Sequence, residues 1–251
     1  MNQSKRIAIV AALEDEIAQI LSNMTITESK LLAGRKFWLA VHHDREVVVV
    51  LSGIGKVAAA ITTVCLIENF EVSQIVYTGV AGAVSEALNV GDIVVGTRFI
   101  QHDMDASPLF PRFVVPGYPT HYFEAEPQLA MNLKEASEKA LMGLANVVRF
   151  DGLFKLRSAQ VHSGTVLSGD QFISSSSVRD RLRREHPGAL AVEMEGAAVA
   201  QVCKDYGTQF GMVRTVSDSA EEQAEKDFSL FLSSVASQYS ALIIKEYLKL
   251  C

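Results

Sequence analysis

Short runs of β-branched and aromatic residues alternate along this chain with longer runs whose apolar residues recur at helical spacing. Residues 7–12 have the composition of a buried strand, whereas the apolar residues between 57 and 65 follow the 3.6-residue spacing of a helix. Alternation of this kind is typical of α/β folds. It predicts further strands at residues 36–41, 46–51, 74–78, 92–100, 159–164, 189–192 and 210–216, and further helices at 127–144, 178–186, 195–206 and 227–250.

Residues 101–126 interrupt this alternation, since they have no clear periodicity and contain most of the prolines. We interpret them as a long loop, and long loops inside compact domains are usually functional or mobile. The chain has neither an internal repeat nor an interdomain linker, and 251 residues suit a single α/β unit. We therefore expect one domain over residues 1–251.

Composition excludes several classes of protein. Apolar residues make up 49% of the chain and charged residues 21%, so the chain can bury a large core and does not have a disordered composition. The 23 basic residues are outnumbered by 29 acidic ones, and a net charge of -6 gives no attraction to a phosphate backbone, so we expect no nucleic-acid partner. The cysteines are widely separated and lack CxxC spacing, which argues against disulfides and structural zinc.

The N-terminal segment does not have the pattern of a signal peptide. Its apolar run at residues 7–13 ends in three acidic residues, Glu14, Asp15 and Glu16. Elsewhere no stretch approaches the ~18 uncharged apolar residues that a membrane span needs. We therefore expect a cytoplasmic protein without a membrane partner.

Acidic side chains follow several of the predicted strands. In open α/β folds, functional groups gather beyond the carboxyl ends of the strands. Three such ends would bring Glu16, Glu195 and Asp218 toward one rim of the sheet, which favours acid/base chemistry on a sugar or a base. For Glu14 and Asp15 the alternative is a helix start, where the helix dipole favours negative charge.

Five strings of residues carry a more specific signal. In chain order they are residues 52–60, 91–95, 168–173, 192–195 and 213–218. In sequence and order they resemble the 5′-methylthioadenosine/S-adenosylhomocysteine nucleosidases of the nucleoside phosphorylase superfamily, and the resemblance runs from residue 6 to about residue 248. It implies a three-layer α/β/α sandwich around a mixed, twisted central sheet. It also implies hydrolysis of the N-glycosidic bond to adenine and a 5-substituted ribose, with neither a cofactor nor a metal.

The resemblance assigns the reacting groups. Cleavage passes through a cation-like sugar, so an acid should neutralise the departing base and an acceptor should activate water. By its match, Asp218 is the acid that protonates N7 of adenine, and Glu16 activates the water. An ordinary Asp has a pKa of about 3.9, so the site must hold the proton at neutral pH through burial, through Ser217 or through the base itself. The alternative role for Asp218 is an N-cap of the segment that follows it.

The resemblance also implies the substrate contacts. Glu195 binds the ribose 2′- and 3′-hydroxyls, since an ionised carboxylate accepts two hydrogen bonds. Phe172 stacks on adenine while the backbone of Ile173 binds its edge. The alternative for Phe172, Ile173 and Met194 is that they are core residues. The other expected substrate-binding residues are Met194 under the sugar, Arg214 beside Glu195 or the water, Phe228 as an aromatic lid, and Ala81, Gly82, Glu193 and Ser217.

Val80 departs from the family pattern. The family commonly has a serine here, in a Thr-Gly-Ser-Ala-Gly turn, so a hydroxyl that could help to hold the nucleophilic water is missing. The backbone amides of Ala81 and Gly82 remain available for the water. Any contact of the water with this turn would then use these amides rather than a side-chain hydroxyl.

The loop that follows His102 and Asp103 departs as well. In the family this loop crosses to a neighbouring subunit and closes the pocket for the 5′ substituent. The resemblance therefore predicts a homodimer in which Leu109, Phe110 and Pro116 complete the partner's pocket, since such an apolar patch is seldom left exposed. The alternative is a loop folded back on its own domain.

Several alternatives to this hydrolase remain. A purine nucleoside phosphorylase would need a cationic cradle for phosphate, whereas residues 14–16 are all acidic and would repel it. Within the hydrolases, the substrate could be 5′-deoxyadenosine or an aminofutalosine-type nucleoside. A non-catalytic binding protein would have no chemical need for both Glu16 and Asp218. A P-loop at residues 53–56 is excluded by its spacing, so we interpret Lys56 as a surface residue at a helix terminus.

Overall fold

The computed structural model describes residues 6–42, 45–147, 159–220, 231 and 237–251, without the side chains of residues 15, 16 and 144–147. Within these residues eleven strands form one mixed sheet, in the order β2-β3-β4-β1-β5-β11-β6-β10-β9-β7-β8. The strands are β1 (Arg6–Ala11), β2 (Thr25–Leu32), β3 (Arg35–His42), β4 (Arg45–Leu51), β5 (Val72–Tyr77), β6 (Val80–Ala83), β7 (Ile93–Gln101), β8 (Phe123–Glu124), β9 (Val161–Ser168), β10 (Ala189–Glu193) and β11 (Gln209–Asp218).

The last strand, β11, organises the sheet. Its first residues pair in parallel with β5 and its last ones in parallel with β6, while its middle pairs antiparallel with β7. Because β6, β10, β9 and β7 follow one another in the sheet, the contact between β11 and β7 closes a ring of strands. The carboxyl ends of β10 and β11 come close together because both strands pair with the short strand β6, where Val192 and Asp218 both lie opposite Gly82, and β9 ends beside β10.

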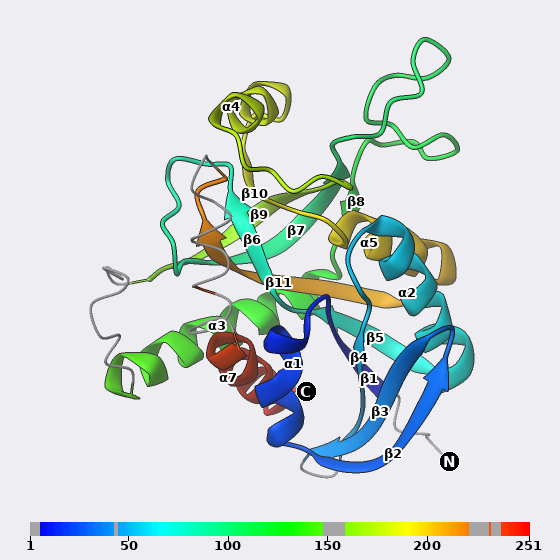
Figure 1. Ribbon diagram of the computed structural model, residues 1–251, viewed down its shortest axis with the longest axis vertical. Helices are drawn as coiled ribbons and strands as arrows, with labels where there is room; N and C mark the ends of the chain where they lie inside the picture. The colour runs from blue at the N-terminus through cyan, green and yellow to red at the C-terminus, as the bar shows by residue number, and fades with distance from the viewer. Residues whose placement is uncertain (1–5, 43–44, 148–158, 221–230, 232–236) are drawn as a thin grey trace.

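Helices cover both faces of the sheet, which confirms the expected three layers (Figure 1). One group packs together on one face: α1 (Glu14–Ser22), α3 (Pro127–Val147) and α7 (Ser237–Leu248). The other face carries α2 (Lys56–Phe70) and α5 (Gly196–Tyr206), while α4 (Ser176–Glu185) stands apart from both groups. No described helix is both long and apolar enough to cross a membrane.

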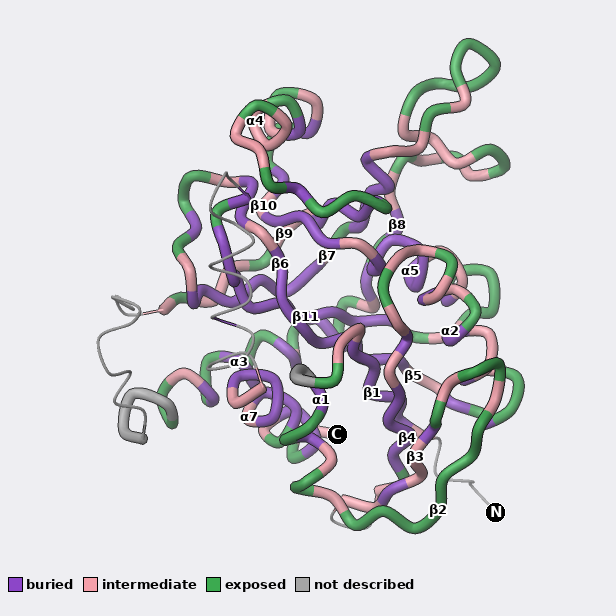
Figure 2. Tube along the Cα trace, in the orientation of Figure 1, coloured by how far each residue is buried: buried purple, intermediate pink, exposed green. Residues whose placement is uncertain are grey.

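The core lies along the central strands. Residues 7–11 and 47–50 are all buried, because strands covered on both faces read as continuous apolar runs. A second, smaller apolar cluster lies under α4 and contains Ile100, Leu167 and Ile173. Figure 2 shows this contrast between a buried sheet and exposed outer segments, among them β2 and the loop that leads from β7 to β8.

The structure corrects several predicted boundaries. Residues 80–83 form β6, although their glycine-rich sequence predicts only a turn. The strand predicted at 159–164 is β9, which runs to Ser168. The helix predicted from residue 178 begins at Ser176, and its N-cap, Ser175, makes no side-chain capping bond. The predicted start of the last helix at residue 227 lies outside the described residues.

Candidate active site

A cavity of about 510 Å³ opens at the carboxyl ends of β6, β10 and β11. It gathers most of the residues that the sequence predicts for the site, from segments that are far apart in the chain. Those that line it are Val80, Ala81, Gly82, Phe172, Ile173, Glu193, Met194, Glu195, Ser217 and Asp218. Its lining is mainly apolar with a few convergent polar groups, which is typical of small-molecule sites.

Asp218 ends β11 and is almost completely buried, with 2% of its surface exposed. Its Oδ2 accepts a hydrogen bond from the Ser217 hydroxyl at 2.7 Å, and its Oδ1 accepts one from the Ala220 amide at 2.8 Å. A Cβ atom on Gly82 would come within 2.9 Å of Oδ1, so only glycine lets β6 pass this close to the carboxylate. The fold thus fixes both the position and the orientation of Asp218.

Arg214 lies on the same strand and is the centre of a buried ionic group. Only 1% of its surface is exposed. Its Nη2 donates to Glu193 Oε2 at 2.6 Å and lies 3.5 Å from Glu195 Oε2, while its Nη1 donates to the Thr78 carbonyl oxygen at 2.6 Å. Its guanidinium carbon stands 4.5 Å from the centre of the Tyr77 ring. One cation therefore neutralises part of the charge of two buried carboxylates. Without a partner of opposite charge, burying each carboxylate would carry a large desolvation cost.

Glu193 lines the cavity, but its oxygens are already occupied by the fold. It accepts hydrogen bonds from the Ser168 hydroxyl, from the Glu195 amide at 3.0 Å and from the Gly196 amide at 2.9 Å. These amides belong to the first turn of α5, where the helix dipole stabilises a carboxylate. Glu193 therefore fixes the turn that carries Met194 and Glu195.

Glu195 is held from the turn before α2 and from β11. Its Oε1 accepts a hydrogen bond from the Gly55 amide at 2.8 Å, and its Oε2 lies 3.5 Å from Arg214 Nη2. Gly55 has a φ of 94°, a conformation that favours glycine, so the turn before α2 can present this amide. The carboxylate is held in place while it faces the cavity.

Tyr77 supports this group from β5, a role that the sequence does not reveal. Its hydroxyl lies 2.6 Å from the Ser52 hydroxyl. Burial, together with the negative charge of Glu195, raises the pKa of Tyr77 well above its usual value. The phenol is therefore neutral, and its ring serves as a face for Arg214.

Much of the remaining lining of the cavity is apolar. Phe172 is 46% exposed, which does not fit a core residue, whereas Ile173 is buried. Val80 and Ala81 form a buried wall from β6. Four residues that the sequence does not mark as site residues also line the cavity, namely Ala12, Leu13, Ile54 and Gln171. Of these, Ile54 and Gln171 lie within segments that resemble the family, residues 52–60 and 168–173.

Other predicted residues are not part of this described lining. Glu16 lies in α1, but its side chain is outside the described part of the chain, and so is the whole of Phe228. Leu109 and Phe110 lie on the loop between β7 and β8, where they are 84% and 44% exposed, and Pro116 lies on the same loop. None of these three loop residues lines the cavity of this protomer.

The interpretation of Lys56 as a surface residue is wrong. Its side chain is only 17% exposed, and its ammonium group pairs with Asp103 at 2.5 Å. Sequence spacing cannot reveal this contact, because the two residues are brought together only by the fold.

The described residues contain no group of three or more His, Cys, Asp or Glu side chains that could hold a metal ion. The chemistry that their arrangement can support is proton transfer by Asp218 and binding of a hydroxylated ligand by Glu195, within one mainly apolar cavity.

Comparison with known proteins places the chain in a family. The model of the phosphorylase superfamily matches residues 6–249. A 5′-methylthioadenosine/S-adenosylhomocysteine nucleosidase of Bacillus pumilus is 35% identical over 241 residues, which are 96% of this chain and 97% of the relative. A Staphylococcus aureus nucleosidase of the same name is 37% identical over 92% of this chain and 93% of its own.

Solved structures agree with this assignment. The nucleosidase of Neisseria meningitidis in complex with methylthio-immucillin-A has a TM-score of 0.85 at 33% identity, over 98% of this chain and 100% of its own. The futalosine hydrolase of Helicobacter pylori has a TM-score of 0.86 at 31% identity, over 99% of each chain. The chain therefore belongs to the phosphorylase superfamily and, within it, to the 5′-methylthioadenosine/S-adenosylhomocysteine nucleosidase family.

Proposed function

We propose that this protein hydrolyses the N-glycosidic bond of 5′-methylthioadenosine and S-adenosylhomocysteine, releasing adenine and a 5-substituted ribose. The observation that carries the proposal is a buried Asp218 that shares one cavity with the Glu195 carboxylate. The nucleosidase relatives supply the substrate class, because their names specify it and they match nearly the whole chain.

Asp218 is the acid in this proposal. It protonates N7 of adenine as the bond to the sugar breaks, so that the base departs as a neutral molecule. Its neighbour Ser217 donates to Oδ2 in the described state. A hydroxyl can both donate and accept, so Ser217 can keep a bond to Asp218 before and after the proton moves.

The sugar is bound by Glu195. Each carboxylate oxygen has more than one lone-pair direction, so Glu195 can bind the vicinal 2′- and 3′-hydroxyls while it keeps the Gly55 amide. Glu193 and Glu195 together outnumber the single charge of Arg214, which favours the positive charge that develops on the sugar. Arg214 and Glu193 act by orienting Glu195 rather than by touching the substrate.

We assign the remaining contacts by the same resemblance. Phe172 stacks on adenine, the backbone of Ile173 binds the edge of the base, Met194 packs under the sugar and Phe228 covers the 5′ substituent. The position of Phe172 in the cavity lining supports its part, since aromatic rings stack in offset arrangements on other flat rings.

Glu16 activates the water in this proposal. Val80 supplies no hydroxyl, and Ala81 and Gly82 lie on β6, a strand that is paired on both sides. We therefore assign the water chiefly to Glu16, and Glu16→Gln should lower adenine release about 10²–10⁴-fold, as for other acid/base residues. The measurement is release of adenine from methylthioadenosine at saturating substrate.

The first test of the function compares the wild-type protein on methylthioadenosine, S-adenosylhomocysteine, 5′-deoxyadenosine and aminofutalosine. We expect the first two to be cleaved most efficiently. Added phosphate should change neither the rate nor the product. Faster cleavage with phosphate, together with ribose 1-phosphate as product, would identify a phosphorylase instead.

A second candidate is hydrolysis of an aminofutalosine-type nucleoside. The Helicobacter pylori futalosine hydrolase, which has a TM-score of 0.86 over 99% of this chain, favours it. The same catalytic groups would serve both substrates, because they differ at the 5′ position. A value of kcat/KM higher for aminofutalosine than for methylthioadenosine would establish this second reading.

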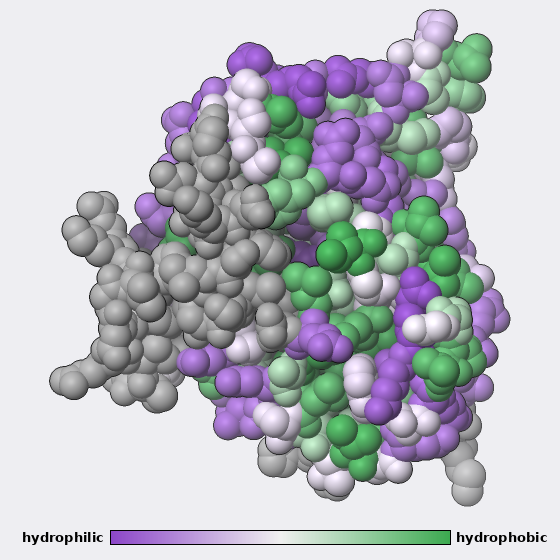
Figure 3. All heavy atoms as spheres, in the orientation of Figure 1, coloured by the Kyte–Doolittle hydropathy of each residue, from purple (hydrophilic) through white to green (hydrophobic). Residues whose placement is uncertain are grey.

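We further propose that two copies of this chain, each a single domain, assemble as a homodimer. Leu109 and Phe110 are exposed on the loop between β7 and β8, and Ile54, Val57 and Ile61 form an exposed apolar row at the start of α2. Figure 3 shows apolar residues on the side of the molecule where α2 lies. A surface of this kind is seldom left open to water.

In the proposed dimer, Leu109, Phe110 and Pro116 complete the partner's cavity. Sedimentation should show a species of twice 27.3 kDa. Phe110→Asp should weaken both the dimer and substrate affinity, whereas Met131→Asp, at an exposed position on α3, should change neither. A fully active monomer would contradict a shared site.

The cellular setting that we propose is the cytoplasm, where adenine release from methylthioadenosine would serve methionine salvage. The free cysteines Cys65, Cys203 and Cys251 support this setting, since unpaired thiols are usual in a reducing compartment.

A further inference from the structure

Two consecutive amides at the start of α2, those of the N-cap Gly55 and of Lys56, bind carboxylates from two different segments of the chain. The Gly55 amide donates to Glu195 Oε1 at 2.8 Å, and the next amide, that of Lys56, donates to Asp170 Oδ1 at 2.8 Å. Glu195 is the proposed ribose ligand. Asp170 directly precedes residues 171–173, which line the end of the cavity proposed for the base. One turn of backbone thus joins the two halves of the site.

The side chain of Lys56 closes a second set of contacts around the same residues. Its Nζ lies 2.5 Å from Asp103 Oδ1, 3.4 Å from Gln101 Oε1 and 3.9 Å from Asp170 Oδ2. Asp103 in turn contacts Asp170, because its Oδ2 accepts a hydrogen bond from the Asp170 amide at 2.9 Å. Lys56, Asp103 and Asp170 therefore form a closed cycle of contacts, which we call the Lys56 cycle.

The surroundings leave this cycle little freedom. A Cβ on Gly55 would come within 3.0 Å of Asp170 Oδ1, and a Cβ on Gly169 would come within 2.3 Å of the His102 ring. The segments that begin at His102 and Gly169 therefore lie in direct contact. Partial burial alone would raise the pKa of Asp103, but the hydrogen bonds from Lys56 and from the Asp170 amide hold it below its usual value. Asp103 is therefore ionised at neutral pH.

We propose that Lys56 and Asp170 are positioning residues that hold the base-binding segment, residues 171–173, in register with the ribose ligand Glu195. The proposal rests on the proposed function, since it takes these groups as the base and ribose ligands. Without the ammonium group, Asp103 and Asp170 face each other as like charges. The base-binding segment then moves relative to α2, and small displacements of this kind lower affinity because the bound geometry is no longer preformed.

The test compares Lys56→Met with Lys139→Met, which removes an exposed lysine that pairs with Glu135 at 2.7 Å on α3. The readouts are the Kd for free adenine by calorimetry, KM and kcat for methylthioadenosine, and the melting temperature. We expect Lys56→Met to raise the adenine Kd and KM about tenfold with a smaller fall in kcat. The substitution displaces the segment that binds the base, whereas the contacts that hold Asp218 stay in place. Lys139→Met should leave all of them unchanged, and Lys56→Arg, which keeps the charge, should restore most of the affinity.

Asp103→Asn provides an independent arm that keeps the shape of the side chain and removes its charge. It should raise the adenine Kd about threefold to tenfold, and its effect should not add to that of Lys56→Met, because the two residues are in contact. If Lys56→Met does not fold, the adenine Kd of Asp103→Asn decides whether the Lys56 cycle positions the base-binding segment.

The outcomes separate the two proposals. A Lys56→Met protein with a lower melting temperature but an adenine Kd and KM within twofold of wild type would mean that the cycle only stabilises the fold, and would overturn the inference. If the wild type binds adenine but does not cleave methylthioadenosine, the proposed function fails and the adenine Kd values still judge the cycle. A wild type that binds no adenine overturns both.

Discussion

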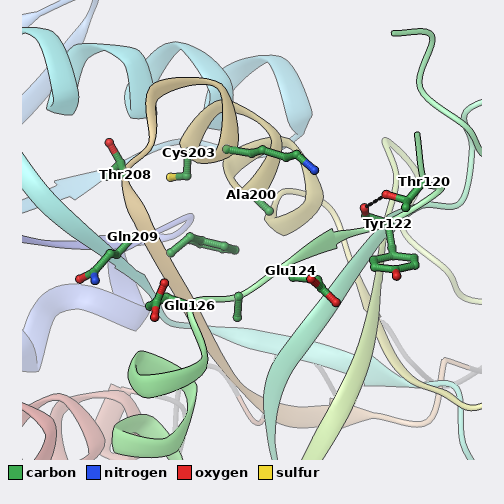
Figure 4. A pocket seen from close by; sticks show the side chains of 11 residues that line it. Thr120, Tyr122, Glu124, Glu126, Ala200, Cys203, Thr208 and Gln209 are labelled. Atoms are coloured by element: carbon green, nitrogen blue, oxygen red, sulfur yellow. Dashed lines mark hydrogen bonds between the residues drawn. The ribbon is translucent and has the colours of Figure 1, made fainter. Parts of the chain in front are cut away.

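Two hollows in this protein differ in how their polar groups are held. The cavity of about 510 Å³ at the strand ends contains buried carboxylates whose oxygens are tied to amides, hydroxyls and Arg214. The second hollow, of about 310 Å³, lies between β8, the end of α5 and the start of β11, and Figure 4 shows Glu124, Glu126 and Gln209 around it.

Charges at the second hollow are exposed and loosely held. Glu124 lies 3.7 Å from Arg98, and more than half of both side chains is exposed. Lys204 lies about 6.0 Å from the Tyr118 ring centre, at the limit of a cation–π contact. Exposed charged groups of this kind are well hydrated and contribute little to the stability of the fold. The fixed orientation of buried polar groups, rather than the presence of a hollow, therefore distinguishes a reactive site.

The largest effect should come from Asp218→Asn. The amide keeps the shape of the side chain but cannot give up a proton to N7, so adenine release should fall about 10²–10⁴-fold while a nucleoside analogue still binds. The matched control is Asp205→Asn, which changes an exposed carboxylate next to the second hollow. A fall of less than tenfold for Asp218→Asn would remove its role as the acid.

Arg214→Met should have the next largest effect, on stability. It leaves the carboxylates of Glu193 and Glu195 without their cation, and breaking a buried ion pair typically costs about 3–5 kcal/mol in the free energy of unfolding. Arg98→Met removes the exposed partner of Glu124 and should cost less than about 1 kcal/mol. Urea denaturation of both variants measures the difference in the free energy of unfolding. Equal losses would show that the buried ionic group of Arg214 contributes no more than the exposed pair of Arg98.

Val80→Ser should have a smaller effect, on the chemical step. If a hydroxyl on β6 can bind the water, kcat should rise about fivefold with KM unchanged, which corresponds to one hydrogen bond of about 1 kcal/mol. Val80→Ala, which removes bulk without adding a hydroxyl, is the control. A large fall in kcat for the serine variant would mean that Val80 packs there for another purpose and that the match of residues 78–82 to the family is wrong.

The smallest effect should come from the second hollow itself. Lys204→Met and Glu126→Gln should leave kcat/KM within about twofold of wild type, because neither side chain lines the cavity that contains Asp218 and Glu195. Steady-state assays at two salt concentrations provide the measurement. A tenfold loss in either variant would show that this hollow takes part in function.

The sequence predicts the parts of the fold and site that depend on local pattern. Strands such as β1 and β5 are predicted because buried strands read as continuous apolar runs, and the rule for strand ends places Glu195 and Asp218 at one rim. The exposed strand β2 has no apolar alternation, and β6 is rich in glycine, so neither is predicted. The resemblance predicts Arg214 beside Glu195, whereas the contacts of Arg214 with Glu193 and Thr78 and the partners of Lys56 could not be predicted. These residues are far apart in the chain and meet only after folding.

The place of β11 has a consequence for synthesis of the chain. It is the last described strand in the sequence, yet it lies inside the sheet and pairs with β5, β6 and β7. Until β11 emerges, those three strands have open edges, and open edges are where unfinished chains pair wrongly with one another. Because β11 also carries Arg214 and Asp218, the strand that closes these edges is also the strand that brings the proposed acid to the cavity. The emergence of β11 therefore both lowers the risk of wrong pairing and places Asp218 beside Gly82.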